Sequence, residues 1–282
     1  MKKTYLIVAS FFNRDIGGVL VFYYLCELLR NLGENAYIIA DKNVCKGRMW
    51  NRLARESGFN IDFYDKKITN EVVIYAETIF GNPYNGKNVV RYLLHKPGFH
   101  THGKFHYGES DLIIGYREAF TTKEFPITDE NCISIVYTMD DVYYQTNFSK
   151  RKKTCYMVRK GIDKDLNLHP NDSICVDDKS HEEIAKIFNE CDKFICYDTD
   201  TYFSEFAVRC GCTSIVIPNG CVSKKEWRPN VKQTYGIAYG LNDIEYAEQT
   251  KDKFWKYQKE IESNNIKAVK KFVKLCEDYF TD

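Results

Sequence analysis

Arg159, Lys160 and Gly161 stand together at the end of a predicted strand, Thr154–Val158. A guanidinium can grip a phosphate in a bidentate way, and a lysine ammonium acts beside it as a point charge. The glycine allows the chain to turn directly after the two cations. This segment therefore predicts a binding site for a diphosphate group, and the alternative is ordinary surface charge.

A second polar segment ends the predicted strand Lys193–Tyr197 and enters a predicted helix, Tyr202–Cys210. Its candidate ligand-binding residues are Tyr197, Asp198, Thr201, Tyr202, Ser204 and Glu205. The hydroxyls and the amino terminus of the helix would hold a phosphate, and Asp198 would bind sugar or ribose hydroxyls. The alternative is a capping role alone for Thr201 or Asp200.

The first half offers a glycine pair and several proton acceptors. Gly17 and Gly18 open a helix after the predicted strand Thr4–Ser10, where backbone amides can approach a ligand. Asp15 precedes the pair. Four histidines also gather in a loop-like segment, at His95, His100, His102 and His106. Their spacing matches no zinc signature, so we expect a proton acceptor or an ordinary structural role and no metal.

The composition excludes several classes of protein. The 282 residues are 44% apolar, which can build a real core, and the net charge of +1 gives no footprint for nucleic-acid binding. No apolar run reaches the roughly 20 residues that a membrane span needs. The eleven cysteines form no CxxC pair, so we expect reduced, buried thiols and a cytoplasmic protein.

Strand and helix signals alternate twice along the chain. The predicted strands are Thr4–Ser10, Asn35–Ala40, Asn60–Phe63, Glu71–Tyr75, Asn88–Leu93, Asp111–Gly115, Ile133–Val136, Thr154–Val158, Ser173–Val176, Lys193–Tyr197 and Thr213–Ile217. Predicted helices begin at Gly17, Arg48, Asp178 and Tyr202, and the chain after Gly240 is expected to be helical. Short continuous apolar runs that alternate with helices are typical of parallel sheets.

We therefore predict an α/β protein with two Rossmann-like domains that face a cleft. The expected boundaries are 1–150 for the first domain, 151–245 for the second, and 246–282 for a carboxyl-terminal helix that packs back on the body. Ligands of such sheets bind at the carboxyl ends of the strands. The candidate residues of both halves fall at such ends.

The chain resembles glycosyltransferases of the GT-B fold, and in particular a bacterial capsule- and lipopolysaccharide-type group. The resemblance is carried by TYLIVASFFNRDIGGVLVFYYLCELLRNLGENAYIIA, by VVRYLLHKPG, by CYMVRKG and by DDKSHEEIAKIFNECDKFICYDTDTYFSEFAVRCGCTSIVIP. It implies that Arg159 and Lys160 neutralise the diphosphate of a donor, and that Asp198 matches the first acid of a two-glutamate motif. Phe206 stands where the second glutamate would lie, and Glu205 is one position early.

The resemblance implies transfer of a sugar from a UDP-, GDP- or similar nucleotide sugar to a hydroxyl of a glycan or a lipid-linked acceptor. We expect no metal and no other cofactor, since fixed cations would stabilise the leaving diphosphate. The base that accepts the acceptor proton is expected to be Asp15, His100 or His102.

Two alternatives share this architecture. A nucleotide-sugar epimerase would act on the donor without an acceptor, and a non-catalytic protein would only bind the nucleotide sugar or the glycan. Basic residues at 150–153 and at Lys267, Lys270, Lys271 and Lys274 also suggest peripheral contact with the inner face of the membrane.

Overall fold

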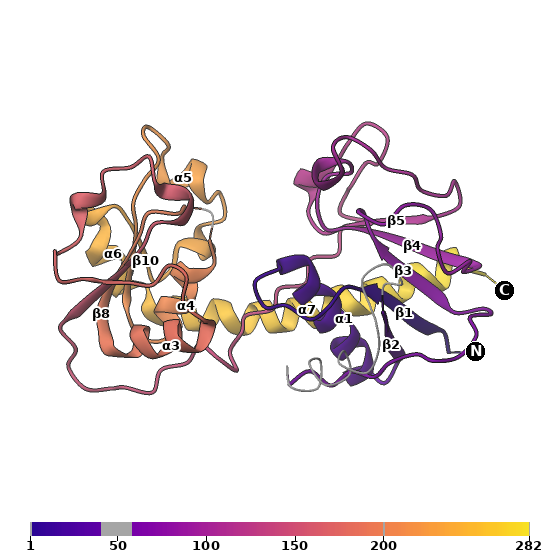
Figure 1. Ribbon diagram of the computed structural model, residues 1–282, viewed down its shortest axis with the longest axis horizontal. Helices are drawn as coiled ribbons and strands as arrows, with labels where there is room; N and C mark the ends of the chain where they lie inside the picture. The colour runs from indigo at the N-terminus through magenta and orange to yellow at the C-terminus, as the bar shows by residue number, and fades with distance from the viewer. Residues whose placement is uncertain (1, 41–57, 200, 282) are drawn as a thin grey trace. The chain divides into compact units, whose positions relative to one another are not determined.

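The computed structural model describes residues 2–40, 58–199 and 201–281. The described chain forms two compact units, Met1–Tyr137 with Ile261–Asp282, and Thr138–Glu260 (Figure 1). Each unit contains one five-stranded sheet, and every strand pair in both sheets is parallel. The predicted fold class, two Rossmann-like α/β domains and a long carboxyl-terminal helix, is confirmed for each unit taken by itself.

The first sheet has the strand order β2-β1-β3-β4-β5. Its strands are β1 Thr4–Ala9, β2 Asn35–Ala40, β3 Val72–Ala76, β4 Asn88–Leu93 and β5 Leu112–Gly115. Helix α1 spans Gly17–Asn31, and two 3₁₀ turns follow later, η1 at Phe99–Thr101 and η2 at Glu118–Phe120. Because β1, β3 and β4 are adjacent and parallel, the loops after them share one edge of the sheet.

The two faces of β1 pack against different partners, as the two-residue period of a strand requires. Tyr5 and Ile7 belong to the cluster that includes α1 and the end of the long helix α7, Lys251–Tyr279. Leu6 and Val8 belong to a separate cluster on the other face. The end of α7 therefore covers one face of this sheet.

The second sheet has the order β10-β9-β8-β6-β7. Its strands are β6 Lys153–Met157, β7 Ile174–Cys175, β8 Cys191–Cys196, β9 Thr213–Val216 and β10 Ile237–Tyr239. The helices are α3 His181–Glu190, α4 Phe203–Arg209, α5 Lys224–Trp227 and α6 Ile244–Gln249. Short 3₁₀ turns are η3 Arg159–Gly161, η4 Leu166–Leu168, η5 Val231–Thr234 and η6 Leu241–Asp243.

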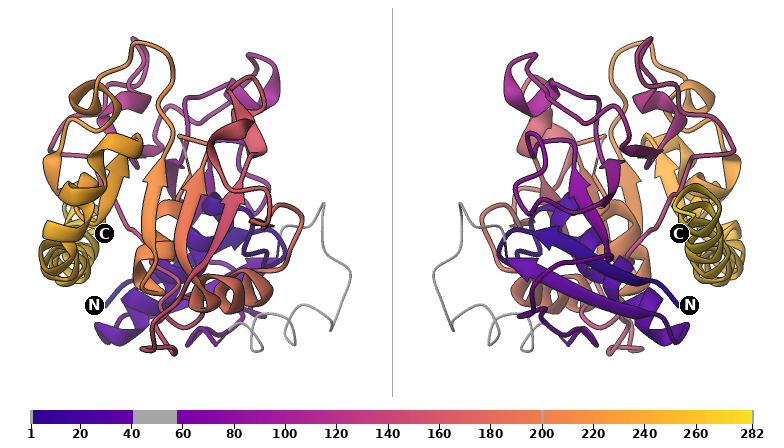
Figure 2. Two further views of the ribbon diagram at one scale, coloured as in Figure 1. Left: turned by 90° about the vertical axis from the view of Figure 1, so that its left-hand side faces the viewer. Right: turned by 90° about the vertical axis from the view of Figure 1, so that its right-hand side faces the viewer.

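Helices cover both faces of the second sheet. On β8, Phe194 contacts Phe188 of α3 with ring centroids 4.8 Å apart, whereas Ile195 packs in a cluster with Ala247 of α6. This alternation is the pattern of a strand that is buried on both faces. In Figure 2 the left view faces this unit, and the long helix α7 is seen nearly end on.

The boundary between the units lies at Tyr137, earlier than the residue 150 that we expected. The reason is the side chain of Asn189, which accepts the N–H of Thr146 at 2.7 Å and donates to the carbonyl of Tyr144 at 3.0 Å. Tyr143 also stacks on Phe206 with ring centroids 4.2 Å apart. The segment 138–150 is thereby held by the second unit.

Three other elements differ from our expectations. The segment Ile133–Val136 is no strand, because the N–H and carbonyl of Val136 bond to the side chain of Asn265 in α7. The segment Asn60–Phe63 makes a single bridge, between Phe63 and Ile38. The helical region after residue 245 breaks at Thr250, where α6 gives way to α7. The helix predicted from Arg48 lies outside the described residues.

The ten cysteines that the structure describes are all free thiols, and most are buried. Burial raises the pKa of Cys26 to about 12, so this thiol behaves as a small core residue. Within the described ranges, no helix has both the length and the apolar composition to cross a membrane.

Candidate functional site

The two predicted phosphate-binding cations lie in η3, directly after the carboxyl end of β6. Arg159 has a φ of 41°, a left-handed conformation that costs a non-glycine residue about 1–2 kcal/mol. Both Arg159 and Lys160 are exposed. Among the residues that the structure describes, no carboxylate forms an ion pair with either of them. The side chains of these two cations at the sheet's carboxyl edge are therefore not engaged by any described carboxylate and can contact an anionic ligand.

Gly161 presses this turn against the end of the neighbouring strand. A Cβ at position 161 would lie 2.3 Å from the carbonyl oxygen of Tyr197, and 2.6 Å from its Cβ. Only glycine allows this approach, since Tyr197 follows β8 and its backbone cannot move without disturbing the sheet. The close packing therefore brings the end of β6 next to the end of β8, as the predicted site required.

The side chain of Arg159 reaches the segment that follows β8. Its guanidinium carbon lies 5.4 Å from the ring centroid of Phe203, the first residue of α4. Thr201 accepts a hydrogen bond from the N–H of Phe203 at 3.3 Å. The neighbourhoods of Arg159 and Thr201 thus lie together within one unit. Because α4 has seven residues, its dipole is small and the cations carry most of the positive potential.

Lys164 is a third cation at this edge, and we did not predict it. Its Nζ donates to the carbonyl of Tyr197 at 2.6 Å and to the carbonyl of Ile217 at 2.5 Å. These carbonyls follow β8 and β9, so the ammonium joins the ends of two strands. In the sequence, the only sign of this role was that Lys164 follows the Arg159-Lys160 pair by four residues.

Several predicted ligand-binding side chains in this unit are engaged with protein partners. Tyr197 is buried, and its hydroxyl is hydrogen-bonded to Nδ1 of His169 at 2.8 Å. The Ser204 hydroxyl donates to the carbonyl of Thr201 and to Glu205. Glu205 also forms an ion pair with Arg228, with 2.7 Å between the charged atoms.

Two other predicted residues in this unit differ in exposure. Asp198 is 3% exposed, directly beyond β8. Tyr202 is the N-cap residue of α4 and is 44% exposed, so its ring is accessible at the same edge.

In the first unit, the glycine pair begins α1, as predicted. A Cβ at Gly18 would lie 3.3 Å from Cδ1 of Leu94, so the helix start is close to the residue that follows β4. Gly17 has open space around it. Asp15 lies in the loop after β1, where its N–H donates to the side chain of Asn13 at 2.8 Å. The strand order brings the Asp15 loop and the end of β4 to the same edge of the first sheet.

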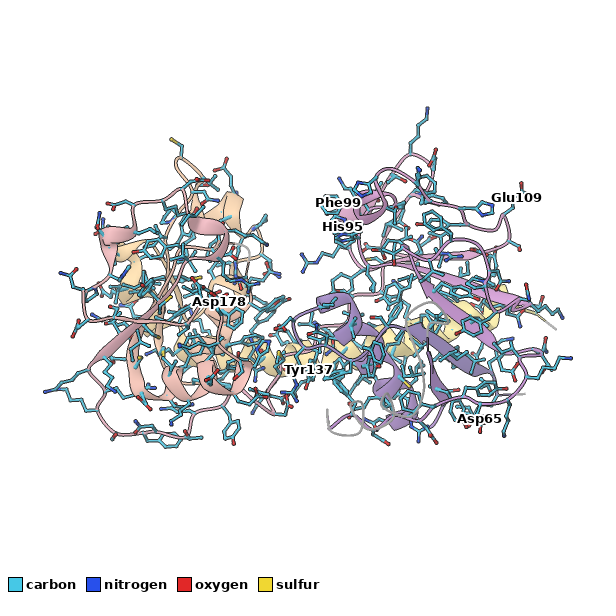
Figure 3. All side chains as sticks on the ribbon, viewed as in Figure 1. Asp65, His95, Phe99, Glu109, Tyr137 and Asp178 are labelled. Carbon is cyan, nitrogen blue, oxygen red and sulfur yellow. The ribbon has the colours of Figure 1, made fainter. Side chains whose placement is uncertain are left out.

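The histidine segment follows β4 on this edge. His95 contacts Phe99 and His100, with ring centroids 4.0 Å and 5.0 Å away, and Figure 3 labels His95 and Phe99 close together. Burial lowers the pKa of His95, and the nearby His100 lowers it further. His100 and His102 are exposed, and His102 has a left-handed φ of 53°. Within the described part of the chain, no His, Cys, Asp and Glu residues gather into a group that could hold a metal ion.

Glu77 is a buried carboxyl group at the same edge, and we did not predict it. It follows β3, is 6% exposed, and accepts the N–H of Leu94 at 3.0 Å. Burial raises its pKa, although backbone hydrogen bonds and the charge of His100 act in the opposite direction. No sequence signal distinguishes Glu77 from a surface acid, because its burial follows from the packing of the loops after β3 and β4.

The comparisons with known proteins find no matching family model and no matching curated protein. Among solved structures, the chain is similar to the glycotransferase of kitacinnamycin, at 9% identity and a TM-score of 0.47, with 99% of this chain and 100% of that chain covered. It is also similar to the glycosyltransferase SnogD from Streptomyces nogalater, at 11% identity and a TM-score of 0.43, covering 98% and 100%.

A third similar structure is a putative UDP-N-acetylglucosamine 2-epimerase from Listeria monocytogenes, at 10% identity and a TM-score of 0.42, covering 94% of this chain and 91% of that one. These TM-scores are below 0.5, so the α/β fold of each unit is assigned from its own strand order and register and not from these similarities. These three neighbours are two glycosyltransferases and one putative epimerase.

Proposed function

We propose that this chain is a glycosyltransferase that moves a sugar from a nucleotide-diphosphate sugar to a hydroxyl of a glycan or a lipid-linked acceptor. One observation carries the proposal: Arg159 and Lys160 are exposed at the carboxyl edge of a parallel sheet, with the Arg159 guanidinium beside Phe203, and their side chains form no ion pair with any described carboxylate. Lys164 adds a third cation, an ammonium, within the same turn region. Three cations at one edge match the charge of a diphosphate.

The reaction needs positive charge where the leaving group forms. The acceptor oxygen forms a bond to the anomeric carbon, and the bond from that carbon to the diphosphate oxygen breaks with its electron pair. The departing nucleoside diphosphate gains negative charge, which Arg159 and Lys160 stabilise without reorganisation. These fixed cations perform the charge neutralisation, so we propose that the transfer is independent of a metal ion.

The acceptor proton goes to a base in the first unit. The candidates are Asp15, in the loop after β1, and the exposed His100 and His102 after β4. A carboxylate or an imidazole at this edge of the first sheet can accept the proton of a hydroxyl. The basic segment 150–153 and the lysines of α7 are proposed to favour peripheral contact with an anionic membrane surface on the cytoplasmic side.

The test begins with thermal shifts in UDP, GDP, ADP, CDP and dTDP and in their sugars, because a ligand that binds the native state raises Tm. Arg159→Ala and Lys160→Ala should reduce this stabilisation and lower transfer, on the order of 10²-fold for the arginine. Lys152→Ala is the matched control, since it removes an exposed cation at the amino end of the same strand. Equal losses in all three variants would contradict the proposed site.

A product assay separates the alternatives. A transferase consumes donor only when an acceptor extract is present, and it releases nucleoside diphosphate in proportion to the sugar transferred. An epimerase converts the donor without an acceptor. A binding protein gives a thermal shift and no turnover, so either of these results would replace the proposal.

A further inference from the structure

We propose that Asp177 is the positioning residue that holds Arg159 in its working conformation. Asp177 follows β7, the strand next to β6, and the N–H of Val176 donates to the carbonyl of Tyr156 at 3.0 Å. This pairing places the carboxylate beside the residues that follow β6. The proposal rests on the function proposed above, since it concerns the same cations.

The Asp177 carboxylate contacts the backbone of the turn, and its Oδ2 also accepts from Sγ of Cys175 at 3.9 Å. Its Oδ2 accepts the N–H of Val158 at 3.0 Å and the N–H of Arg159 at 3.4 Å. The two successive amides belong to the residues where the chain leaves β6 and enters η3. A single oxygen that accepts from both fixes the direction in which the turn begins.

Two unfavourable features meet in this turn. Arg159 has a left-handed φ of 41°, and Oδ1 of Asp177 is buried without a hydrogen-bond partner among the described residues. Strained backbone conformations and unpaired buried polar atoms cost free energy, and they persist only where the surrounding contacts impose them. Such features are concentrated at functional sites. Here the carboxylate supplies the contact that stabilises the left-handed residue.

The consequence of the left-handed turn is the direction of the Arg159 side chain. An extended residue at this position would continue the alternation of β6, whereas the left-handed residue sends its guanidinium toward the ring of Phe203. The turn is closed by the N–H of Gly161, which donates to the carbonyl of Val158 at 2.7 Å. Asp177 therefore acts on a ligand only through Arg159.

Two conservative substitutions separate the effect of the position of the Asp177 acceptor oxygen from the effect of its negative charge. Asp177→Asn keeps an acceptor oxygen at the same distance from the backbone and removes the negative charge. Asp177→Glu keeps the charge and displaces the oxygen by one methylene. If Asp177 positions Arg159, the asparagine variant binds UDP or GDP within about twofold of the wild type, and the glutamate variant binds about tenfold more weakly. Asp178→Asn, at the exposed neighbour labelled in Figure 3, is the matched control and should bind as the wild type does.

A double-mutant cycle tests whether the effect passes through Arg159. In an Arg159→Ala background, Asp177→Glu should cause no further loss of affinity, because the side chain that it displaces is gone. A loss of undiminished size in that background overturns the inference. So does the reverse pattern, in which asparagine weakens binding and glutamate preserves it.

A measurement without ligand keeps the inference independent of the proposed function. Hydrogen exchange at the amides of Val158 and Arg159, followed by NMR, should be faster in Asp177→Glu than in the wild type, and close to the wild-type rate in Asp177→Asn. If the wild type binds no nucleoside diphosphate, the proposed function fails, and this exchange pattern still decides whether Asp177 holds the turn. Unchanged exchange in Asp177→Glu overturns the inference.

Discussion

At the scale of single residues, burial decides whether an ionisable side chain keeps its ordinary pKa and whether a ligand can reach it. Glu77 is almost completely covered, and its carboxyl group is held by the N–H of Leu94. Because burial disfavours the charged form, its pKa is raised in the folded protein. By contrast, Arg159 and Lys160 are exposed, so an anion in solution can contact their charged groups.

The raised pKa of Glu77 predicts a dependence of stability on pH. A folded-state pKa above the unfolded value means that the protonated form contributes stability below the unfolded pKa, and that this contribution is lost as the pH rises through the folded pKa. The wild type should therefore lose stability relative to Glu77→Gln as the pH rises above 4.5, the ordinary pKa of a glutamate side chain. The measurement is Tm of both proteins from pH 4 to pH 8.

Glu109→Gln is the matched control, because Glu109 is an exposed carboxyl in the same unit. Its Tm difference from the wild type should change less with pH than that of Glu77→Gln. A Tm difference for Glu77→Gln that is constant across the series would show that the burial of Glu77 has no energetic consequence.

At the scale of elements, helix α3 shows how local sequence signals fix a boundary. Ser180 accepts the N–H of Glu183 at 3.2 Å, and Glu183 in turn accepts the N–H of Ser180 at 2.9 Å. This capping box satisfies two backbone donors that would otherwise lack partners at the helix start. It also lowers the pKa of Glu183 through the hydrogen bonds from Ser180. Because this cap is made of local contacts, α3 begins at His181, three residues after the start that we expected at Asp178.

Removal of this cap should destabilise the second unit. Ser180→Ala deletes one side of the capping box, and the expected cost is about 1 kcal/mol in the free energy of unfolding. Denaturant titration followed by circular dichroism provides the measurement. Ser263→Ala is the matched control, since Ser263 is exposed within α7 and alanine is favoured inside a helix. Equal losses in the two variants would show that the cap contributes nothing specific.

At the scale of the whole molecule, helix α7 supplies core residues to both units. Its first part belongs to the second unit, where Gln258 accepts a buried hydrogen bond from Arg209 at 2.6 Å. Its later part belongs to the first unit, where Phe272 contacts Tyr5 with ring centroids 5.7 Å apart. Each unit therefore includes one portion of α7 in its buried interior.

Replacing one buried phenylalanine in each portion of α7 should destabilise only the unit to which that portion belongs. Phe272→Ala and Phe254→Ala should each cost about 3–5 kcal/mol, because both side chains are buried and a cavity is left behind. Hydrogen exchange should rise in β1 peptides for Phe272→Ala and in β10 peptides for Phe254→Ala. Lys274→Ala, at an exposed position of the same helix, is the control. Faster exchange in both sheets for either substitution would contradict the separate dependence of the units on α7.

The sequence alone determined the features that depend on neighbouring residues. Apolar runs predicted every strand of the two sheets except β10, the glycine pair predicted where α1 begins, and Gly161 predicted the turn after Arg159 and Lys160. These signals are readable because the backbone conformation of a short segment depends mainly on its own residues.

Only the tertiary structure decided which of these segments meet. The contact of Gly161 with Tyr197, the ammonium of Lys164 between two strand ends, and the burial of Glu77 all join residues that are distant along the chain. They depend on strand orders that do not follow the order of the sequence, β2-β1-β3-β4-β5 in the first unit and β10-β9-β8-β6-β7 in the second. Side-chain packing across the faces of the sheet sets that order, and no local pattern of residues records it.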